Sequence, residues 1–125
     1  MILLDTSILI DFYRKKDKTK TAFFQLQQNY TKFAISVLTQ FEIYKGAKEE
    51  NMKFWDDFFR KLFILPLDSE AVFIAANIDN ELKKINKRIE VADLLIAATA
   101  IRNNIPCATL NLKHFERIEN LQLIS

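Results

Sequence analysis

The chain has 125 residues, half of them apolar, which is the size of a single domain that buries one hydrophobic core. Its 18 Lys and Arg residues nearly balance its 16 Asp and Glu residues, and the net charge of +2 argues against both a disordered chain and a generally basic nucleic-acid-binding surface. The single cysteine excludes an internal disulfide bond, and an acid at position 5 interrupts any apolar region of a signal peptide. Because no apolar run approaches about 20 residues, we expect a cytoplasmic protein without membrane contact.

Short apolar runs alternate with helical patterns along the whole chain. Strands are predicted at residues 2–4, 33–36, 63–65 and 106–109, with a weaker fifth at 121–124. Helices are predicted at residues 8–14, 21–28, 39–49, 52–62 and 92–102, and a long helix begins near Ser69 with Ile74, Ile78, Leu82 and Ile85 on one face. This alternation predicts an α/β fold with a mainly parallel sheet of four to five strands flanked by helices, in which ligands bind beyond the carboxyl ends of the strands.

Three acidic residues follow predicted strands or begin a predicted helix, and each also has a structural interpretation. Asp5 ends the first strand and is a typical N-cap for the next helix. Thr39 and Glu42 have the spacing of a capping box at the start of the helix after the second strand. Asp93 lies in the first turn of the helix at 92–102, where the helix dipole favours an anion. Taken singly, none of the three acids requires a catalytic role.

Taken together, the three acids predict a metal site at one edge of the sheet. Carboxylates that meet at this edge would repel one another by several kcal/mol. A divalent cation offsets that repulsion, and Mg²⁺, or alternatively Mn²⁺, prefers hard oxygen ligands together with coordinated water. Such an ion lowers the pKa of a bound water and stabilises a leaving oxygen, so the expected reaction is phosphodiester hydrolysis. Whether the acids converge depends on the strand order, which their spacing does not determine.

Four segments of the chain form an ordered set of motifs. They are Leu-Leu-Asp-Thr-Ser-Ile-Leu-Ile-Asp at 3–11, Ile-Ser-Val-Leu-Thr-Gln-Phe-Glu-Ile at 35–43, Ala-Asp-Leu-Leu-Ile-Ala-Ala-Thr-Ala at 92–100 and Thr-Leu-Asn-Leu-Lys-His-Phe at 109–115. In content, order and spacing these segments resemble the PIN domain family, and within it the VapC-like toxins of VapBC-type toxin-antitoxin systems. The resemblance covers nearly the whole chain. It implies a PIN-like three-layer sandwich formed by a single domain, residues 1–125.

The resemblance also implies the residues of an active site. Asp5, Glu42 and Asp93 correspond to the family's catalytic acids, which hold Mg²⁺ directly or, for Glu42, alternatively through water. Supporting hydrogen bonds are implied for Thr6, Ser7 and Asn111. The implied activity is that of a metal-dependent endoribonuclease.

The last motif departs from the family pattern. Many members place a fourth acid there, whereas the two candidate positions of this chain hold Asn111 and His114. Three carboxylates with several waters still satisfy Mg²⁺, so we expect the departure to weaken metal affinity. For His114 the favoured interpretation is structural. Asp11 is expected on a helix face outside the metal site, and Asp68, followed by Ser69, as a helix N-cap.

A cluster of positive charges lies between the first two predicted helices. Five of its seven positions are basic, namely Arg14, Lys15, Lys16, Lys18 and Lys20. These side chains are candidates for contacts with an RNA backbone, because phosphate contacts supply most non-specific affinity. A solvated loop explains them equally well. A second basic run at residues 83–88 is interpreted as a solvated helix end.

One short predicted helix is unusually rich in aromatic residues. Its apolar side chains are Phe54, Trp55, Phe58, Phe59, Leu62 and Phe63. Most of them are expected in the core, and the excess is wide enough to form an exposed groove for an amphipathic segment. The resemblance implies such a partner, because VapC-like toxins are typically dimers bound by an antitoxin.

The leading hypothesis is an endoribonuclease toxin that cleaves a structured RNA, such as transfer or ribosomal RNA, and is neutralised by a cognate antitoxin. Two alternatives stay open. One is a PIN nuclease for housekeeping RNA processing, and the other is a catalytically weak or silent scaffold that binds RNA or protein. DNA is a further conceivable substrate, because metal-assisted phosphate chemistry does not itself distinguish the sugars.

Overall fold

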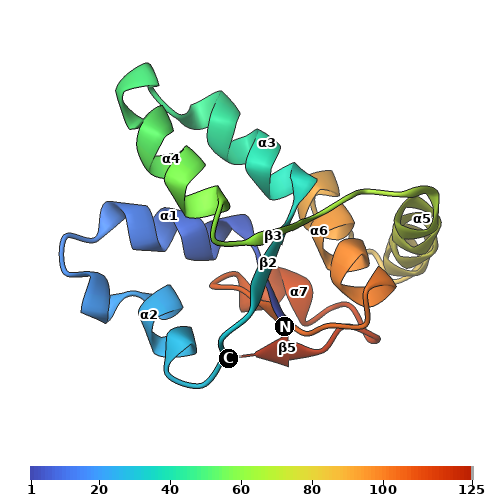
Figure 1. Ribbon diagram of the computed structural model, residues 1–125. Coiled ribbons are helices and arrows are strands. Elements are labelled where there is room, and N and C mark those ends of the chain that lie inside the picture. Colours follow the sequence, from blue (N-terminus) through green and yellow to red (C-terminus); the bar gives the residue numbers. More distant parts are fainter. Residues whose placement is uncertain (125) are drawn as a thin grey trace.

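A five-stranded parallel sheet forms the centre of the computed structural model, which describes residues 1–124 (Figure 1). The strand order is β3-β2-β1-β4-β5. The bounds are β1 Ile2–Leu4, β2 Phe33–Ser36, β3 Phe63–Leu65, β4 Cys107–Ala108 and β5 Leu123–Ile124. The predicted parallel sheet is therefore confirmed, and it includes the weaker fifth strand.

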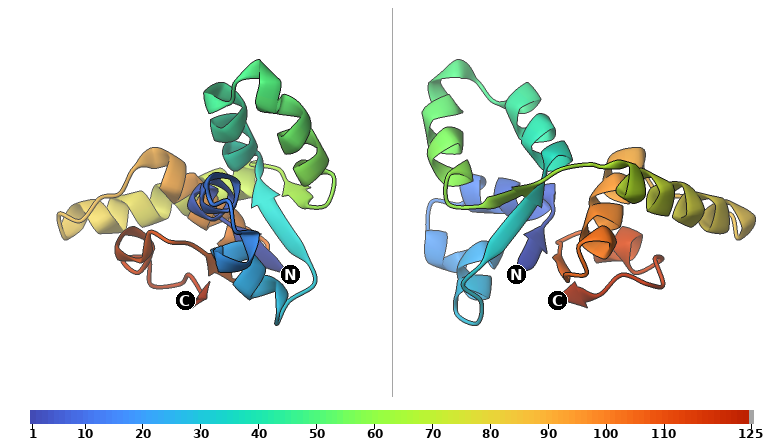
Figure 2. Two further views of the ribbon diagram at one scale, coloured as in Figure 1. Left: turned by 90° about the vertical axis from the view of Figure 1, so that its left-hand side faces the viewer. Right: turned by 45° about the vertical axis from the view of Figure 1, so that its right-hand side comes forward.

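Helices cover both faces of this sheet. They are α1 Thr6–Arg14, α2 Ala22–Gln27, α3 Val37–Gly46, α4 Met52–Phe59, α5 Ser69–Lys84, α6 Val91–Arg102 and α7 Leu112–Phe115, with short 3₁₀ turns at Lys18–Lys20 and Glu49–Asn51. Figure 1 shows α1 to α4 on one side of the sheet and α5 to α7 on the other. Figure 2 shows α3 and α4 as a helix pair rising above the sheet and α5 extending away from it. The predicted three-layer arrangement is confirmed.

Alternating side chains of the central strands supply the two halves of the core. In β1, Ile2 and Leu4 pack with the aromatic side chains of α2 and α4, whereas Leu3 packs with α6 and α7. In β2, Ile35 packs in the same half of the core as Leu4, and Ala34 packs in the same half as Leu3. Because both faces are buried, these strands are continuous apolar runs, as is typical of parallel sheets.

The start of α3 corrects one prediction. Thr39 and Glu42 were expected to form a capping box, but the helix begins at Val37 and its N-cap is Ser36. The Ser36 hydroxyl accepts a hydrogen bond from the Leu38 N–H at 3.0 Å. Since a serine at the end of the strand already caps the helix, Thr39 lies inside the first turn with its side chain fully buried.

Other boundaries differ from the predicted ones by a few residues. The α3 helix ends at Gly46 rather than at residue 49, and α4 ends at Phe59 rather than at 62. Ile85 was expected on one face of α5 together with Ile78 and Leu82, but it follows the last helical residue and is 60% exposed. Helix ends fray and are the least determined part of a periodic pattern.

Two predicted structural acids have the expected roles. Asp68 is the N-cap of α5 and accepts a hydrogen bond from the Ala71 N–H at 2.9 Å. Asp11 accepts from the Ala22 N–H at 2.9 Å and pairs with Lys15 at 2.8 Å. Asp11 therefore ties α1 to the start of α2. Within residues 1–124, no helix combines the length and the apolar character needed to cross a bilayer.

Candidate active site

The candidate site lies where the chain changes direction in the sheet. From β1 the chain adds β2 and then β3 on one side, and later returns to place β4 on the other side of β1. The carboxyl ends of β1 and β4 therefore flank the topological switch point, where open α/β sheets bind ligands. Asp5 directly follows β1, and Thr109 directly follows β4.

Asp5 is buried at this switch point, with 2% of its surface exposed. One carboxylate oxygen, Oδ1, accepts from both the Ser7 N–H, at 2.9 Å, and the Ser7 hydroxyl. The other oxygen, Oδ2, accepts from the Thr109 hydroxyl at 2.7 Å. The Asp5 carboxylate is thus the N-cap of α1 and also the centre of a hydrogen-bond network, so its structural and functional interpretations are compatible.

The network fixes the loop that follows β4. The Ser7 hydroxyl accepts from the Leu110 N–H at 3.0 Å, and the Thr109 hydroxyl accepts from the Asn111 N–H at 2.9 Å. Ser7 was predicted as a supporting residue, whereas Thr109 was not singled out. The position of Thr109 could have identified it as a site residue, since Thr109 directly follows β4 just as Asp5 directly follows β1.

The electrostatics of Asp5 disfavour its negative charge. Burial is the main cause that raises its pKa, the hydrogen bonds from Ser7 and Thr109 oppose the rise, and the nearby charge of Asp93 adds to it. Burial together with Asp5 and Asp93 also raises the pKa of the Cys107 thiol in β4. The charge of Asp93 therefore adds to the cost of ionising Asp5, and the convergence of the three acids stays a prediction.

Glu42 lies on α3 and is held by α1. Its Oε1 accepts from the Thr6 hydroxyl at 2.7 Å, and the hydroxyls of Thr6 and Thr39 are 3.0 Å apart. Thr6 is adjacent to Asp5 in the chain, so this bond ties the Glu42 carboxylate to the residue that follows Asp5. The supporting role predicted for Thr6 thus has a definite hydrogen-bond partner.

Asp93 lies in the first turn of α6 and contacts the loop after β4. Its Oδ2 is 3.4 Å from Asn111 Nδ2 and 3.3 Å from His114 Nδ1, and these two nitrogens are 2.8 Å apart. The Asn111 side chain makes no capping bond to α7, which leaves its amide free to face Asp93. The structural interpretation favoured for His114 did not anticipate this contact with a candidate catalytic acid.

The donor set fits a Mg²⁺ site completed by substrate. Within residues 1–124, no three Asp, Glu, His or Cys side chains gather closely enough to form a metal cluster by themselves. Mg²⁺, however, is commonly held by one or two carboxylates plus substrate phosphates. Asp5 and Asp93 would supply two such carboxylates, and among the described residues no cationic side chain lowers the pKa of buried Asp5. Glu42, held by Thr6, suits a contact through water.

The five candidate RNA-binding cations differ in the interactions that they form in the structure. Lys18 donates to the backbone carbonyls of Phe12, Tyr13 and Lys15, and its ammonium lies 4.9 Å from the centre of the Phe12 ring. Lys18 therefore caps the carboxyl end of α1. Lys15 pairs with Asp11. The remaining cations, Arg14, Lys16 and Lys20, have exposed side chains and form no ion pair within the described residues.

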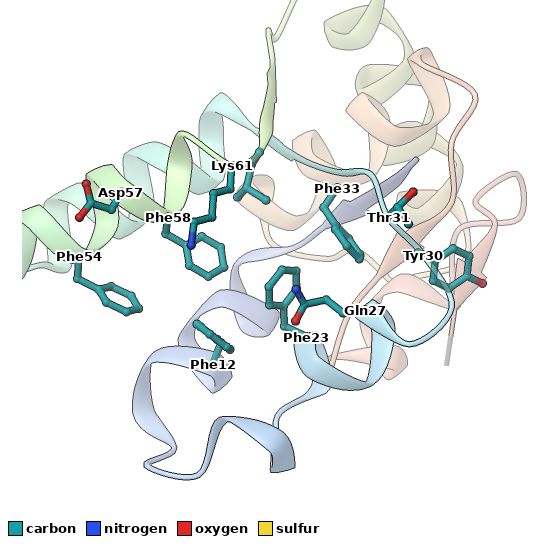
Figure 3. A pocket seen from close by; sticks show the side chains of 11 residues that line it. Phe12, Phe23, Gln27, Tyr30, Thr31, Phe33, Phe54, Asp57, Phe58 and Lys61 are labelled. Carbon is teal, nitrogen blue, oxygen red and sulfur yellow. The ribbon is translucent and has the colours of Figure 1, made fainter.

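A groove lies beside α4 on the face of the sheet that α1 to α4 cover (Figure 3). It encloses about 640 Å³, and we call it the aromatic groove. Figure 3 shows Phe54 and Phe58 from α4 facing Phe12 from α1 and Phe23 from α2 across it. Trp55, Phe58 and Phe59 are mostly buried, which confirms the core role expected for most of α4.

Comparisons with known proteins place the chain in a family. Residues 2–121 match the PIN domain. Ribonuclease VapC1 of Methanocaldococcus jannaschii is 37% identical over 98% of this chain and 84% of that protein, and Ribonuclease VapC of Rickettsia bellii is 36% identical over 99% and 95%. The chain of VapBC2 from Rickettsia felis, solved bound to a promoter DNA fragment, has a TM-score of 0.86 at 30% identity, with 99% of this chain and 98% of that chain covered.

A second solved structure, VapBC-1 from nontypeable Haemophilus influenzae, has a TM-score of 0.86 at 26% identity and covers 100% of this chain and 98% of that chain. The chain belongs to the PIN domain family, and the two relatives named above carry the name Ribonuclease VapC. The resemblance of the four sequence motifs is thereby confirmed.

Proposed function

We propose that the protein is a Mg²⁺-dependent endoribonuclease toxin of a toxin-antitoxin pair. The observation that carries this proposal is the Asp5 carboxylate, which is buried at the switch point of the sheet, is subject to the negative charge of Asp93 and forms no ion pair with a cationic side chain of residues 1–124. The relatives named Ribonuclease VapC support the same reaction class. A carboxylate pair without a protein cation favours a divalent ion at that place.

Each side chain of the site has a distinct role in this proposal. Asp5 and Asp93 bind the cation, and Glu42 orients a water through its second carboxylate oxygen. The cation supplies Lewis-acid stabilisation of the charge that develops on the phosphate. Ser7 and Thr109 hold the Asp5 carboxylate in place through their hydroxyls, as supporting groups do at metal sites. Thr6 does the same for Glu42.

The proposed substrate is a structured RNA such as transfer or ribosomal RNA. The test is incubation of purified protein, free of antitoxin, with total cellular RNA in the presence of Mg²⁺, Mn²⁺ or chelator. We expect discrete fragments with either metal and none with chelator, and the same reaction with DNA tests the sugar preference. A folded protein that leaves all RNA intact would instead favour a silent scaffold that binds RNA or protein.

The absence of a fourth acid gives a prediction about metal affinity. Replacing His114, which contacts Asp93, by Asp adds a carboxylate to the site and should tighten Mg²⁺ binding by about tenfold. Titration calorimetry measures this affinity without reference to catalysis. His114→Asn is the matched control, because it has the shape of Asp without its charge. Equal Mg²⁺ affinities of the two variants would show that position 114 lies outside the metal site.

The aromatic groove is the proposed binding site for the antitoxin. The solved VapBC structures that this chain resembles are toxin-antitoxin complexes, and the groove presents clustered aromatic side chains of the kind that anchor an amphipathic helix. Tyr30 lines the groove and is 36% exposed, so Tyr30→Ala should leave the fold intact. We expect antitoxin binding about tenfold weaker in titration calorimetry.

Phe73→Ala is the control for that prediction, because Phe73 is 69% exposed on α5, outside the groove. A Tyr30 variant that binds antitoxin as tightly as the Phe73 variant would place the antitoxin elsewhere.

A homodimer is the proposed assembly. Large apolar side chains are exposed on α3 and on the edge strand β3, namely Phe41, Phe63 and Ile64, each more than a third exposed. Exposed apolar residues in such number support burial against a second copy of the chain. Sedimentation equilibrium of the purified protein distinguishes the dimer from a monomer.

A further inference from the structure

A second cavity has Glu42 in its lining and does not include Asp93. It encloses about 580 Å³ between α1, α3 and the segment that leads into α4, and we call it the Glu42 cavity. Ile43 and Trp55 form an apolar wall together with half-buried Tyr13. Glu42 lies in one wall, and Arg14 contributes a positive charge. The volume lies within the range typical of small-ligand sites.

The only glycine of the chain, Gly46, lines this cavity. A Cβ atom added to Gly46 would meet no atom within 4 Å, and its backbone does not have a positive φ. Neither packing nor backbone conformation therefore requires glycine here, although glycine is less favourable than alanine in a helix. The missing side chain leaves the wall of the cavity open next to Glu42.

Arg14 connects the Glu42 cavity with the edge of the sheet where the metal site is proposed. Its side chain also lines a neighbouring cavity of about 470 Å³ that is formed with Thr6, Ser7 and Leu110. Within the described part of the chain, Arg14 forms no ion pair or side-chain hydrogen bond, in contrast to nearby Lys15 and Lys18. An exposed guanidinium between two cavities can bind a phosphate with two parallel hydrogen bonds.

We propose that the Glu42 cavity binds one nucleotide of the RNA substrate, next to the phosphate that is cleaved. Arg14 contacts the phosphate that links this nucleotide to the reacting one. The base lies against the apolar wall at Tyr13, as bases of unpaired RNA pack on aromatic side chains. Gly46 leaves room for the sugar and base to approach α3. This proposal rests on the proposed ribonuclease function and adds a subsite to it.

Nucleotide binding in the Glu42 cavity can be followed through two residues whose resonances are unique in the spectrum. The chain has one glycine and one tryptophan, and both Gly46 and Trp55 line the Glu42 cavity. In an amide correlation spectrum with Mg²⁺ present, each of the four nucleoside 5′-monophosphates serves as a probe. We expect at least one nucleotide to shift the Gly46 amide and the Trp55 indole resonances in a saturable way. Shifts confined to other residues would overturn the proposal.

A charge variant tests the role of Arg14 in the same titration. Arg14→Gln should weaken nucleotide binding at least fivefold, because the phosphate loses its cationic partner. Arg60→Gln is the matched control, since Arg60 is an exposed arginine of the α4 end outside this cavity. Equal affinities of the two variants would remove Arg14 from the subsite.

A filling variant tests whether RNA cleavage uses the cavity. Gly46→Leu should reduce the rate of RNA cleavage at least tenfold while the melting temperature stays unchanged or rises, and Gly46→Ala provides a smaller version of the same change. Ala76→Leu introduces the same side chain at an exposed position of α5 and should cleave at the parent rate. Unchanged cleavage by Gly46→Leu would overturn the proposal. If that variant instead lost antitoxin affinity, the cavity would belong to the protein partner.

The same experiments separate this inference from the proposed function. If the parent protein cleaves RNA but no nucleotide shifts the Gly46 and Trp55 resonances, the subsite is wrong and the nuclease stands. If nucleotides shift both resonances in a protein that cleaves no RNA, the binding site stands and the nuclease falls.

Discussion

Replacing Asp93 by Asn is expected to slow RNA cleavage by about a hundredfold or more. The substitution removes one of the two carboxylates proposed to hold Mg²⁺, while the amide keeps the size of the side chain. The amide oxygen that remains at position 93 can still accept from Asn111 or His114, so the fold should be preserved. Initial rates of RNA cleavage at saturating Mg²⁺ measure the effect, and circular dichroism verifies the fold.

Glu81→Gln is the control for this prediction, because Glu81 is an exposed acid of α5. It should cleave RNA at the parent rate. If Asp93→Asn were as fast as this control, Asp93 would have no catalytic role and the metal site would have to be placed elsewhere.

Replacing Asp5 by Asn should abolish cleavage and at the same time stabilise the protein in the absence of divalent cations. Burial and the neighbouring Asp93 charge disfavour the ionised Asp5 carboxylate, as its raised pKa indicates. A neutral amide of the same shape removes this repulsion and keeps an oxygen for Ser7. We expect the free energy of unfolding at neutral pH to rise by about 1 to 3 kcal/mol, measured by urea denaturation in chelator.

The pH dependence of this difference follows from the direction of the Asp5 pKa shift. The folded protein holds the Asp5 proton more tightly than the unfolded chain, in which the pKa is near 3.8. The contribution of protonated Asp5 to stability is therefore complete below the unfolded pKa and is lost as the pH rises through the raised folded pKa. The stability gap between Asp5→Asn and the parent should widen over the same pH interval.

Saturating Mg²⁺ should reverse that order. A ligand that binds only the folded parent protein stabilises it by about 4.1 kcal/mol at a concentration a thousandfold above its Kd, whereas Asp5→Asn should gain much less. A variant whose stability in chelator equals that of the parent at every pH, or which Mg²⁺ stabilises equally, would show that Asp5 does not carry the uncompensated charge.

Much of this architecture can be read from local patterns in the chain. Short apolar runs indicate all five strands, and single residues such as Asp5 and Asp68 indicate the starts of helices. Strand preference, helical periodicity and N-capping depend on residues within a few positions of one another. The family motifs added the candidate site Asp5, Glu42 and Asp93, whose assignment as metal ligands stays a prediction.

The arrangement of the site depends on contacts between distant segments. The order of the strands brings Thr109 to Asp5, 104 positions apart, and α6 brings Asp93 to Asn111 and His114. Sequence spacing contains no information about which strand ends meet, because that choice minimises the free energy of the whole packed sheet.

The predictions that failed or were incomplete have the same physical origin. Thr39 and Glu42 satisfy the local pattern of a capping box, yet Ser36 caps the helix and Thr6 from another helix takes both side chains as partners. Lys18 belongs to a basic run that suggests RNA contact, but its ammonium donates hydrogen bonds to backbone carbonyls at the carboxyl end of α1. Local patterns of the chain specify which groups can form hydrogen bonds. Tertiary packing selects their partners, because a buried polar group is stable only when the fold places a hydrogen-bond partner next to it.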